Sequence, residues 1–469
     1  MQFDNFIFPI FFAIVLALYW GVRRRVPQNV VLLVSSYVFY GWWDYRFLSL
    51  VALSTIVDFV IARQLDATDD KRRRKLLVST SVVVNLGILG VFKYAGFFVA
   101  SAQAALLSLG VQANVQVLEI LLPVGISFYT FQTLSYTIDV YRREMPASRD
   151  LLAFGCYVAF FPQLVAGPIE RATRLLPQFE RPRAVTHEQW RSGLTLILYG
   201  FIKKIAVADQ MSPYVDLVYA EGATEASGPL IFAATLAFAV QIYADFSAYS
   251  DIARGTARWL GIELCVNFDQ PYRSRTPSEF WRRWHISLSS WLRDYLYIPL
   301  GGNRGSEWFT YRNLCLTMLL GGLWHGAAWN FVLWGAFHGA ILAVYRFAKI
   351  DRKLRNASAA TGYSAQVVFF LLTLYGWLLF RAHSWDQVVE LTLGLGLGWS
   401  QWALAMPLLG VVLYFTAPVL VHHALAKNLG GEKWAPSTLL PFAAVTSALV
   451  LFGVLQARAS QAAFIYFQF

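Results

Sequence analysis

Charged side chains are scarce in this chain, because Asp, Glu, Lys and Arg make up only 14% of its 469 residues. Soluble domains contain about 25% charged and about 45–50% apolar residues. Here 57% of the residues are hydrophobic and the mean hydropathy is +0.47. This composition excludes a soluble enzyme and a disordered tail. The aromatic share of 16%, with 17 Trp, is typical of a protein with much bilayer and interfacial surface.

Cysteine is equally rare. The three cysteines, Cys156, Cys265 and Cys315, lie far apart and form no C-x-x-C pair. The sequence therefore predicts no disulfide scaffold, zinc site or redox pair. It also lacks G-x-S-x-G, P-loop and H-E-x-x-H motifs, so serine hydrolysis, ATP hydrolysis and zinc peptidase chemistry have no local support. We expect no bound metal and no permanently bound cofactor.

The net charge of +11 comes from short basic clusters that separate apolar runs. The positive-inside rule produces this pattern, so it indicates a polytopic membrane protein and not a nucleic-acid partner. Arg23, Arg24 and Arg25 follow the first apolar run and are expected in the cytoplasm, which places the N-terminus outside. The cluster Lys71 to Lys75 is then cytoplasmic as well.

The apolar runs predict about ten to twelve membrane segments in a single all-helical domain over residues 1–469. Two short runs, 30–42 and 46–62, are expected to form a shallow or tilted hairpin. The run 151–170 contains Pro162 and Gly167-Pro168, which predicts a re-entrant segment covered by protein. The other expected spans are 6–22, 77–100, 117–140, 191–209, 228–250, 312–323, 327–346, 364–381, 402–424 and 437–456.

The stretch 251–311 alternates charged residues with Trp, Tyr and Phe. This pattern predicts an amphipathic helix at the membrane interface, with its rings at headgroup level and its arginines directed at phosphates. Simple interfacial anchoring explains the same pattern.

His325 lies within an apolar segment, 318–340, that has no Lys, Arg, Asp or Glu. A charged group at such a depth costs about 2.5 kcal/mol or more, so we expect a neutral imidazole facing the interior. It is either a general base or a structural histidine bonded to a neighbouring helix. In a continuous helix His338 lies roughly 220° further around, which favours a structural role for it. His285 can meet His325 only through tertiary packing.

Two acidic residues lie in or near the segment 228–250. Asp245 has no partner at i+3 or i+4, so it is either protonated or matched by a distant Arg or His. Asp245 either stabilises the packing of the helices or takes part in the function. Asp251 has Arg254 and Arg258 nearby, which predicts a structural ion pair.

Six motifs that occur in order resemble the membrane-bound O-acyltransferase (MBOAT) family, and within it the bacterial alginate O-acetylation branch. They are SSYVFYGWW (35–43), PVGISFYTFQTLSYTIDVYR (123–142), FFPQLVAGPIER (160–171), QIYADFSAYSDIARG (241–255), FWRRWHISLSSWLRDYLYIPLGGNR (280–304) and TMLLGGLWHGAAWNFVLWGAFHG (317–339). The likeness covers about residues 1–345. The segments beyond it, about 364–456, are similar in hydropathy alone.

The resemblance implies an all-helical membrane fold around a tunnel, with acyl-CoA entering from the cytosol and an acceptor hydroxyl from the periplasm. It implies that His325, in the W-H-G motif, is catalytic and that His285 is a second catalytic position. Three roles are open to His285: it orients the acceptor, polarises the thioester carbonyl or relays a proton. The expected substrate-binding residues are Trp324, Asp245, Arg273, Arg275, Arg282 and Arg283, the four arginines contacting the CoA phosphates. Positive-inside anchoring is an equal explanation for each arginine.

The expected function is O-acetylation of an exopolysaccharide such as alginate from the inner membrane, with acetyl-CoA as donor and periplasmic acetyltransferases as partners. Cellulose, peptidoglycan and teichoic-acid-type polymers are alternative acceptors. A transporter that uses Asp245 and His325 as a proton relay is a rival, but its usual paired broken helices are not evident. A non-catalytic scaffold of a secretion complex is the third hypothesis.

Overall fold

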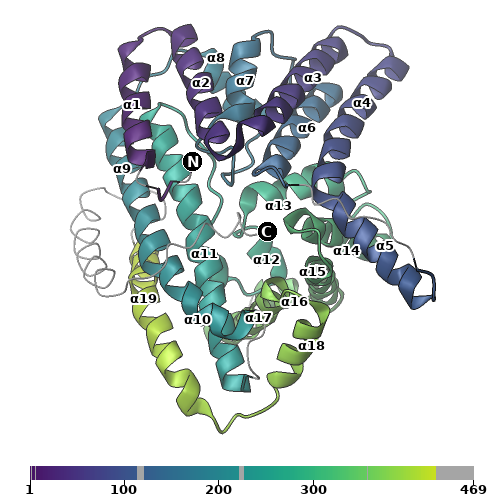
Figure 1. Cartoon of the computed structure of the whole chain (residues 1–469). Helices are drawn as coiled ribbons and strands as arrows, with labels where there is room; N and C mark the ends of the chain where they lie inside the picture. Colours follow the sequence, from purple (N-terminus) through teal and green to yellow (C-terminus); the bar gives the residue numbers. More distant parts are fainter. Residues whose placement is uncertain (2, 6, 113–120, 221–225, 356, 429–469) are drawn as a thin grey trace. The chain divides into compact units, whose positions relative to one another are not determined.

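The computed structural model describes residues 1, 3–5, 7–112, 121–220, 226–355 and 357–428 (Figure 1). All regular secondary structure in these ranges is helical, which confirms the predicted all-α class. The described chain divides into two compact units. The first contains Met1–Gly193 and Ala253–Cys265, and the second contains Leu194–Ile252 and the chain from Val266 onward.

Within the described residues, four helical stretches are long and apolar enough to cross a membrane. They are Arg25–Asp66, Lys71–Ser108, Gly228–Trp259 and Ala359–Arg381. Two shorter apolar helices, Ile7–Gly21 and Trp402–Ala417, accompany them. The prediction of a multi-pass membrane protein is therefore confirmed. The expected span 437–456 and part of 117–140 lie outside the described residues.

The first unit contains α1 to α8 and the start of α9. Their bounds are α1 Ile7–Gly21, α2 Arg25–Asp44, α3 Leu48–Asp66, α4 Lys71–Leu89, α5 Ala95–Ser108, α6 Ile126–Arg142, α7 Leu151–Ala159, α8 Ala172–Glu180 and α9 His187–Phe201. The π-helix η2 (Gly90–Tyr94) joins α4 to α5.

The structure contains the two helices predicted at 30–42 and 46–62, but both are longer than expected. Helix α2 has 20 residues and α3 has 19, and a short 3₁₀ helix (Tyr45–Phe47) joins them. The apolar runs ended too early because the helices continue through polar residues that are buried and hydrogen-bonded. Gln28 and Asn29, for example, donate their side-chain amides to backbone carbonyls of the same unit.

Helix α7 confirms the short, interrupted segment expected at 151–170. It has 9 residues and gives way to turns after Ala159, immediately before Pro162. Residues 153–170 are buried, and the carbonyl of Tyr157 accepts hydrogen bonds from the amides of Gln132 (2.6 Å) and Gln163 (3.1 Å). Protein groups therefore satisfy the backbone at the point where the helix ends, as a broken segment at membrane depth requires.

A buried carboxylate network joins α3, α4 and α6. Asp58 is fully buried and accepts hydrogen bonds from the Ser81 hydroxyl, from the Asn85 amide at 2.8 Å and from the Thr137 hydroxyl at 3.1 Å. The Asn85 carbonyl accepts in turn from Ser54 and Thr133. Because an unsatisfied buried polar group costs far more than a hydrogen bond gains, the network fixes these three helices in register.

The second unit contains the end of α9, the π-helix η3 (Ile202–Ala208), most of α11 and the helices that follow. Their bounds are α10 Asp209–Tyr219, α11 Gly228–Trp259, α12 Pro277–Trp281, α13 Ile286–Leu292, α14 Glu307–His325, α15 Trp329–Phe347, α16 Ile350–Arg355, α17 Ala359–Arg381, α18 Trp385–Gly394 and α19 Trp402–Asn428. Helices α14 and α15 lie side by side (Figure 1).

Glycines allow α14 and α15 to approach closely. A Cβ atom on Gly322 would lie 2.2 Å from the Phe331 carbonyl oxygen, and one on Gly335 would lie 2.4 Å from that of Met318. The helices are separate elements, because α14 ends at His325 and α15 begins at Trp329. The continuous helix considered for His325 and His338 is therefore not found.

The prediction of an amphipathic interfacial helix over 251–311 was wrong. Residues up to Trp259 complete α11, and the rest forms short elements: the 3₁₀ helix η4 (Pro271–Arg273), α12, α13 and the π-helix η5 (Arg293–Tyr297). The side chains of Phe280, Trp284 and Leu288 are buried. The rings pack on one another, with the ring centroids of Phe280 and Trp284 stacked at 5.6 Å. The aromatic residues of this stretch therefore form part of the protein core.

We predict that Asp58→Leu destabilises the protein by about 2–4 kcal/mol, because it leaves Ser81, Asn85 and Thr137 without their buried acceptor. Thermal unfolding in detergent measures the loss. Asp69→Leu is the matched control, since Asp69 is exposed and its ion pair with Arg143 lies at the surface. It should cost at most about 1 kcal/mol. Equal melting temperatures for the two variants would contradict the prediction.

Candidate functional site

His325 is the last residue of α14 and is buried among aromatic rings. Its ring centroid lies 5.1 Å from Trp324, 5.1 Å from Trp334 and 5.5 Å from Phe380, each in an edge-on arrangement. The close packing of α14 on α15 brings Trp334 to this place, and α17 supplies Phe380. The imidazole therefore has the low-dielectric, apolar surroundings that the sequence predicts for it.

His285 precedes α13 as its N-cap and is fully buried. Its backbone has φ +42°, a left-handed conformation that is uncommon for a residue other than glycine. The ring packs edge-on against Phe246 of α11 at 4.7 Å. Strained backbone conformations cluster at functional sites, where the surrounding structure holds them in place.

The tertiary structure brings the two predicted histidines together. The ring centroids of His285 and His325 are 6.5 Å apart, although 40 positions separate them in the sequence. Trp324, which was expected to bind substrate, contacts both rings, at 5.8 Å from His285 and 5.1 Å from His325. One buried cluster thus holds two titratable rings and an indole that contacts both of them.

Sequence reasoning missed Asn267, a buried residue that contacts His285. Its side-chain oxygen lies 3.2 Å from Nδ1 of His285 and accepts hydrogen bonds from the backbone N–H (3.1 Å) and hydroxyl (2.9 Å) of Ser287. Its amide nitrogen donates to the Ser250 hydroxyl of α11 at 3.4 Å. The residue stands in the motif NFDQPY, where nothing in the local pattern marks it as a partner of a histidine.

His338 lies on α15 within the same aromatic region. Its ring is 4.7 Å from Trp334, the indole that also contacts His325. It packs further against Phe280 and Trp281. The structural role predicted for His338 fits this packing.

Asp245 was expected to be protonated or matched by a distant Arg or His, and the structure pairs it with a distant lysine, Lys204 of the π-helix η3. Lys204 is buried and lies 2.9 Å from the carboxylate oxygens of both Asp245 and Asp209. The proposed role of Asp245 in substrate binding stays a prediction. The neighbouring Lys203 lies 2.6 Å from Asp251, and the expected pairing of Asp251 with Arg254 and Arg258 stays a prediction. The competing cation comes from another helix, which local spacing does not reveal.

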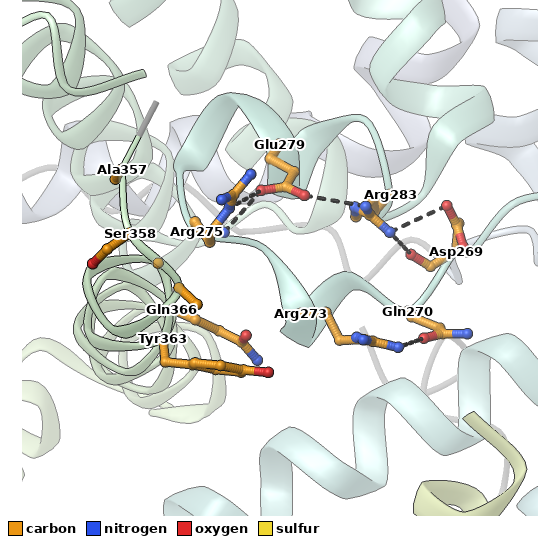
Figure 2. A pocket seen from close by; sticks show the side chains of 12 residues that line it. Asp269, Gln270, Arg273, Arg275, Glu279, Arg283, Ala357, Ser358, Tyr363 and Gln366 are labelled. Atoms are coloured by element: carbon orange, nitrogen blue, oxygen red, sulfur yellow. Dashed lines mark hydrogen bonds and ion pairs between the residues drawn. The ribbon is translucent and has the colours of Figure 1, made fainter. Parts of the chain in front are cut away.

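A second site is an open pocket of about 550 Å³ between the 269–283 stretch and the start of α17 (Figure 2). Three of the four predicted arginines line it: Arg273, Arg275 and Arg283. Arg282 is exposed and is not among the lining residues. Tyr363, Gln366 and Ser358, the N-cap of α17, line the opposite side.

The pocket arginines differ in their partners. Arg283 lies 3.1 Å from Glu279 and 3.3 Å from Asp269, and Arg275 lies 3.8 Å from Glu279. Arg273 donates instead to the neutral side chain of Gln270 at 2.8 Å (Figure 2). The charge of Arg273 is thus less compensated than that of its neighbours, and the positive end of the α17 helix dipole adds to the positive potential.

Metal ligation finds no support in the described ranges, because no group of three or more His, Cys, Asp or Glu side chains is placed there to hold an ion. The chemistry available to the site is that of two buried imidazoles, a hydrogen-bonded amide and an aromatic enclosure. Such a set suits proton transfer to and from a substrate oxygen or sulfur in the absence of bulk water.

Comparison with known proteins gives the class of this membrane protein. The model of the membrane-bound O-acyltransferase family matches residues 34–381, and the chain belongs to this family. It is therefore an O-acyltransferase, and the transporter and scaffold hypotheses have no support.

Several relatives are named as enzymes that modify a cell-envelope or extracellular polymer. A probable alginate O-acetylase of Azotobacter vinelandii is 46% identical over 385 residues, which are 82% of this chain and 75% of the relative. A peptidoglycan O-acetyltransferase of Helicobacter pylori is 32% identical over 78% of this chain and 73% of its own length. A teichoic acid D-alanyltransferase of Bacillus subtilis is 26% identical over 55% of this chain and 68% of its own length.

The burial of His285 predicts an acid-sensitive contribution to stability. Burial lowers the pKa of His285 from 6.5 to about 3, so between these values the unfolded chain binds a proton that the folded chain does not. Stability is therefore lost as the pH falls below about 6.5.

We expect the melting temperature of His285→Gln to fall less than that of the wild type when the pH is lowered from about 7.5 to 5. The variant lacks the imidazole whose protonation favours the unfolded chain. Thermal unfolding at several pH values is the measurement. His187→Gln, at an exposed residue, should keep the full wild-type dependence. The same dependence in His285→Gln and in the wild type would refute the assignment.

Proposed function

We propose that this protein is an acetyltransferase of the bacterial inner membrane, with its N-terminus in the periplasm. It takes acetyl groups from cytosolic acetyl-CoA and passes them to the periplasmic side for O-acetylation of an exopolysaccharide such as alginate. Periplasmic acetyltransferases act as its partners. The observation that carries the proposal is the buried pair of His285 and His325, with ring centroids 6.5 Å apart, in a chain of this family.

The proposed reaction needs one base. An acceptor hydroxyl has a pKa near 15 or 16, so it attacks a thioester carbonyl slowly unless its proton leaves as the C–O bond forms. His325 accepts that proton, the C–S bond breaks, and the proton passes to the departing thiolate of CoA. A neutral, buried imidazole can take up this proton, and general-base catalysis of this kind contributes about 10²–10⁴-fold to the rate.

The pocket beside α17 is the proposed binding site for the phosphates of CoA. Arg273 is the principal contact, because its hydrogen-bond partner is the neutral Gln270, whereas Arg275 and Arg283 form ion pairs with Glu279. The N-terminus of α17 supplies additional N–H donors, which favour phosphate. Tyr363, an exposed aromatic ring at the pocket, offers a surface for the adenine.

The relatives support the proposed acceptor class. The 46% identical relative is named for alginate and the 32% identical one for peptidoglycan, and this order favours an exopolysaccharide over a cell-wall polymer. Peptidoglycan, cellulose or a teichoic-acid-type polymer is the alternative. The acetyl group passes either directly to the sugar or through a partner protein. Turnover of the isolated enzyme with the sugar alone indicates the direct route, and turnover only with a partner protein indicates the other.

We predict that His325→Ala lowers turnover by about 10²–10⁴-fold, because it removes the proposed base. The assay follows CoA release from acetyl-CoA by the purified protein, with periplasmic extract of a polysaccharide-producing host as the acceptor source. His187→Gln serves as the control histidine. A folded His325→Ala protein with wild-type turnover would return His325 to a packing role.

The donor pocket gives a second prediction. Arg273→Gln should raise the KM for acetyl-CoA by about 10-fold or more with little change in kcat, since a charge-assisted bond to phosphate stabilises ground and transition states alike. Arg282→Gln is the matched control, because it removes the same charge from an exposed neighbour outside the pocket. Equal KM values for the two variants would contradict the assignment of the pocket.

A further inference from the structure

The surroundings of Asn267 determine which way its amide points. The backbone N–H of Ser287 acts only as a donor, and it lies 3.1 Å from one terminal atom of the Asn267 side chain. That atom must therefore be the carbonyl oxygen, and the other, beside the Ser250 hydroxyl, is the NH₂ group. The backbone carbonyl of Asn267 also accepts from the N–H of Ile286 at 2.9 Å, so the residue is held at both ends.

The orientation of the amide fixes the proton on His285. The carbonyl oxygen of Asn267 lies 3.2 Å from Nδ1. Two bare lone pairs at that distance repel each other, whereas an N–H at Nδ1 forms a hydrogen bond. In a neutral imidazole one nitrogen carries the proton and the other is an acceptor. A proton on Nδ1 therefore leaves Nε2 of His285 as the acceptor.

The ring has little freedom to escape this arrangement. Phe246 contacts it edge-on at 4.7 Å and Phe268 lies stacked at 6.5 Å. The backbone of His285 is held in its left-handed conformation by Ile286 and Ser287, both of which bond to Asn267. Asn267 thus controls the backbone, the orientation and the tautomer of His285 together.

We propose that Asn267 is a positioning residue for acyl transfer, which holds His285 as the Nδ1–H tautomer and presents a bare Nε2 to the reacting groups. This inference rests on the proposed function, in which His285 and His325 form the buried pair at the reacting groups. It also separates the three roles open to that residue. A bare Nε2 accepts a hydrogen bond from an acceptor hydroxyl or takes up its proton, but it has no hydrogen with which to polarise a thioester carbonyl.

The tautomer is measurable without any assay of activity. Nitrogen NMR of protein labelled with ¹⁵N-histidine in lipid bilayers distinguishes protonated from bare ring nitrogens. The difference between wild-type and His285→Gln spectra isolates the His285 signals. We expect a protonated Nδ1 and a bare Nε2 in the wild type. In Asn267→Leu, which has no acceptor, we expect loss of that single tautomer. A protonated Nε2 in the wild type would overturn the proposal.

Turnover provides the second readout. Asn267→Leu should lower kcat by about 10- to 100-fold, the size of effect seen when a group that orients a metal-binding histidine is removed. Asn267→Asp keeps an oxygen acceptor and should restore the tautomer and most of the turnover. Asn313→Leu is the control for losing a buried amide, since Asn313 is equally buried, at 1% exposure, and donates to the Gly302 carbonyl. It should keep kcat within about threefold of the wild type.

The outcomes separate two failures. If His285→Gln has wild-type turnover, His285 plays no part in the reaction. This outcome would contradict both the role of His285 in the proposed function and the positioning role of Asn267. If His285→Gln is inactive but Asn267→Leu matches Asn313→Leu in turnover, only the Asn267 proposal falls. The expected pattern is an inactive His285→Gln, an impaired Asn267→Leu and a largely active Asn267→Asp.

Discussion

The position of helix α11 depends on charges that are buried and paired. Lys203 and Lys204 are consecutive residues of the π-helix η3, and both form ion pairs with α11, through Asp251 and Asp245. The two ion pairs therefore join η3 to α11 at two positions, six residues apart on α11. A buried charge without a partner is strongly destabilising, so these pairs leave α11 little freedom to slide or rotate.

The fixed position of α11 also fixes part of the candidate site. Helix α11 carries Phe246, which packs on His285, and Ser250, which binds the amide of Asn267. The histidines are therefore held by elements that are themselves fixed by ion pairs and by glycine-mediated packing of α14 on α15. The same physics acts in the first unit, where Asp58 draws hydrogen bonds from two neighbouring helices. In both units polar groups, and not apolar contacts alone, determine the register of the helices.

Much of the fold and part of the site were predictable from the sequence. Low charge, apolar runs and basic clusters predict an all-helical membrane protein, and Pro162 predicts the interruption after α7. His325 stands out because it lies in an apolar segment without other charge. The failures share one cause. Hydropathy counts polar residues as breaks, so α2 and α3 seemed too short, and an aromatic stretch with arginines resembled an interfacial helix although its rings pack inside the protein.

The sequence by itself determined the class of structure and which histidines to suspect, because composition and local spacing report burial and periodicity. Only the tertiary structure decided their partners. It placed His285 beside His325, matched Asp245 with Lys204 and Asp251 with Lys203, and put Asn267 against Nδ1 of His285. The physical reason is that hydrogen bonds and ion pairs act over a few ångströms in space, and the packing of separate helices, not distance along the chain, sets which groups come that close.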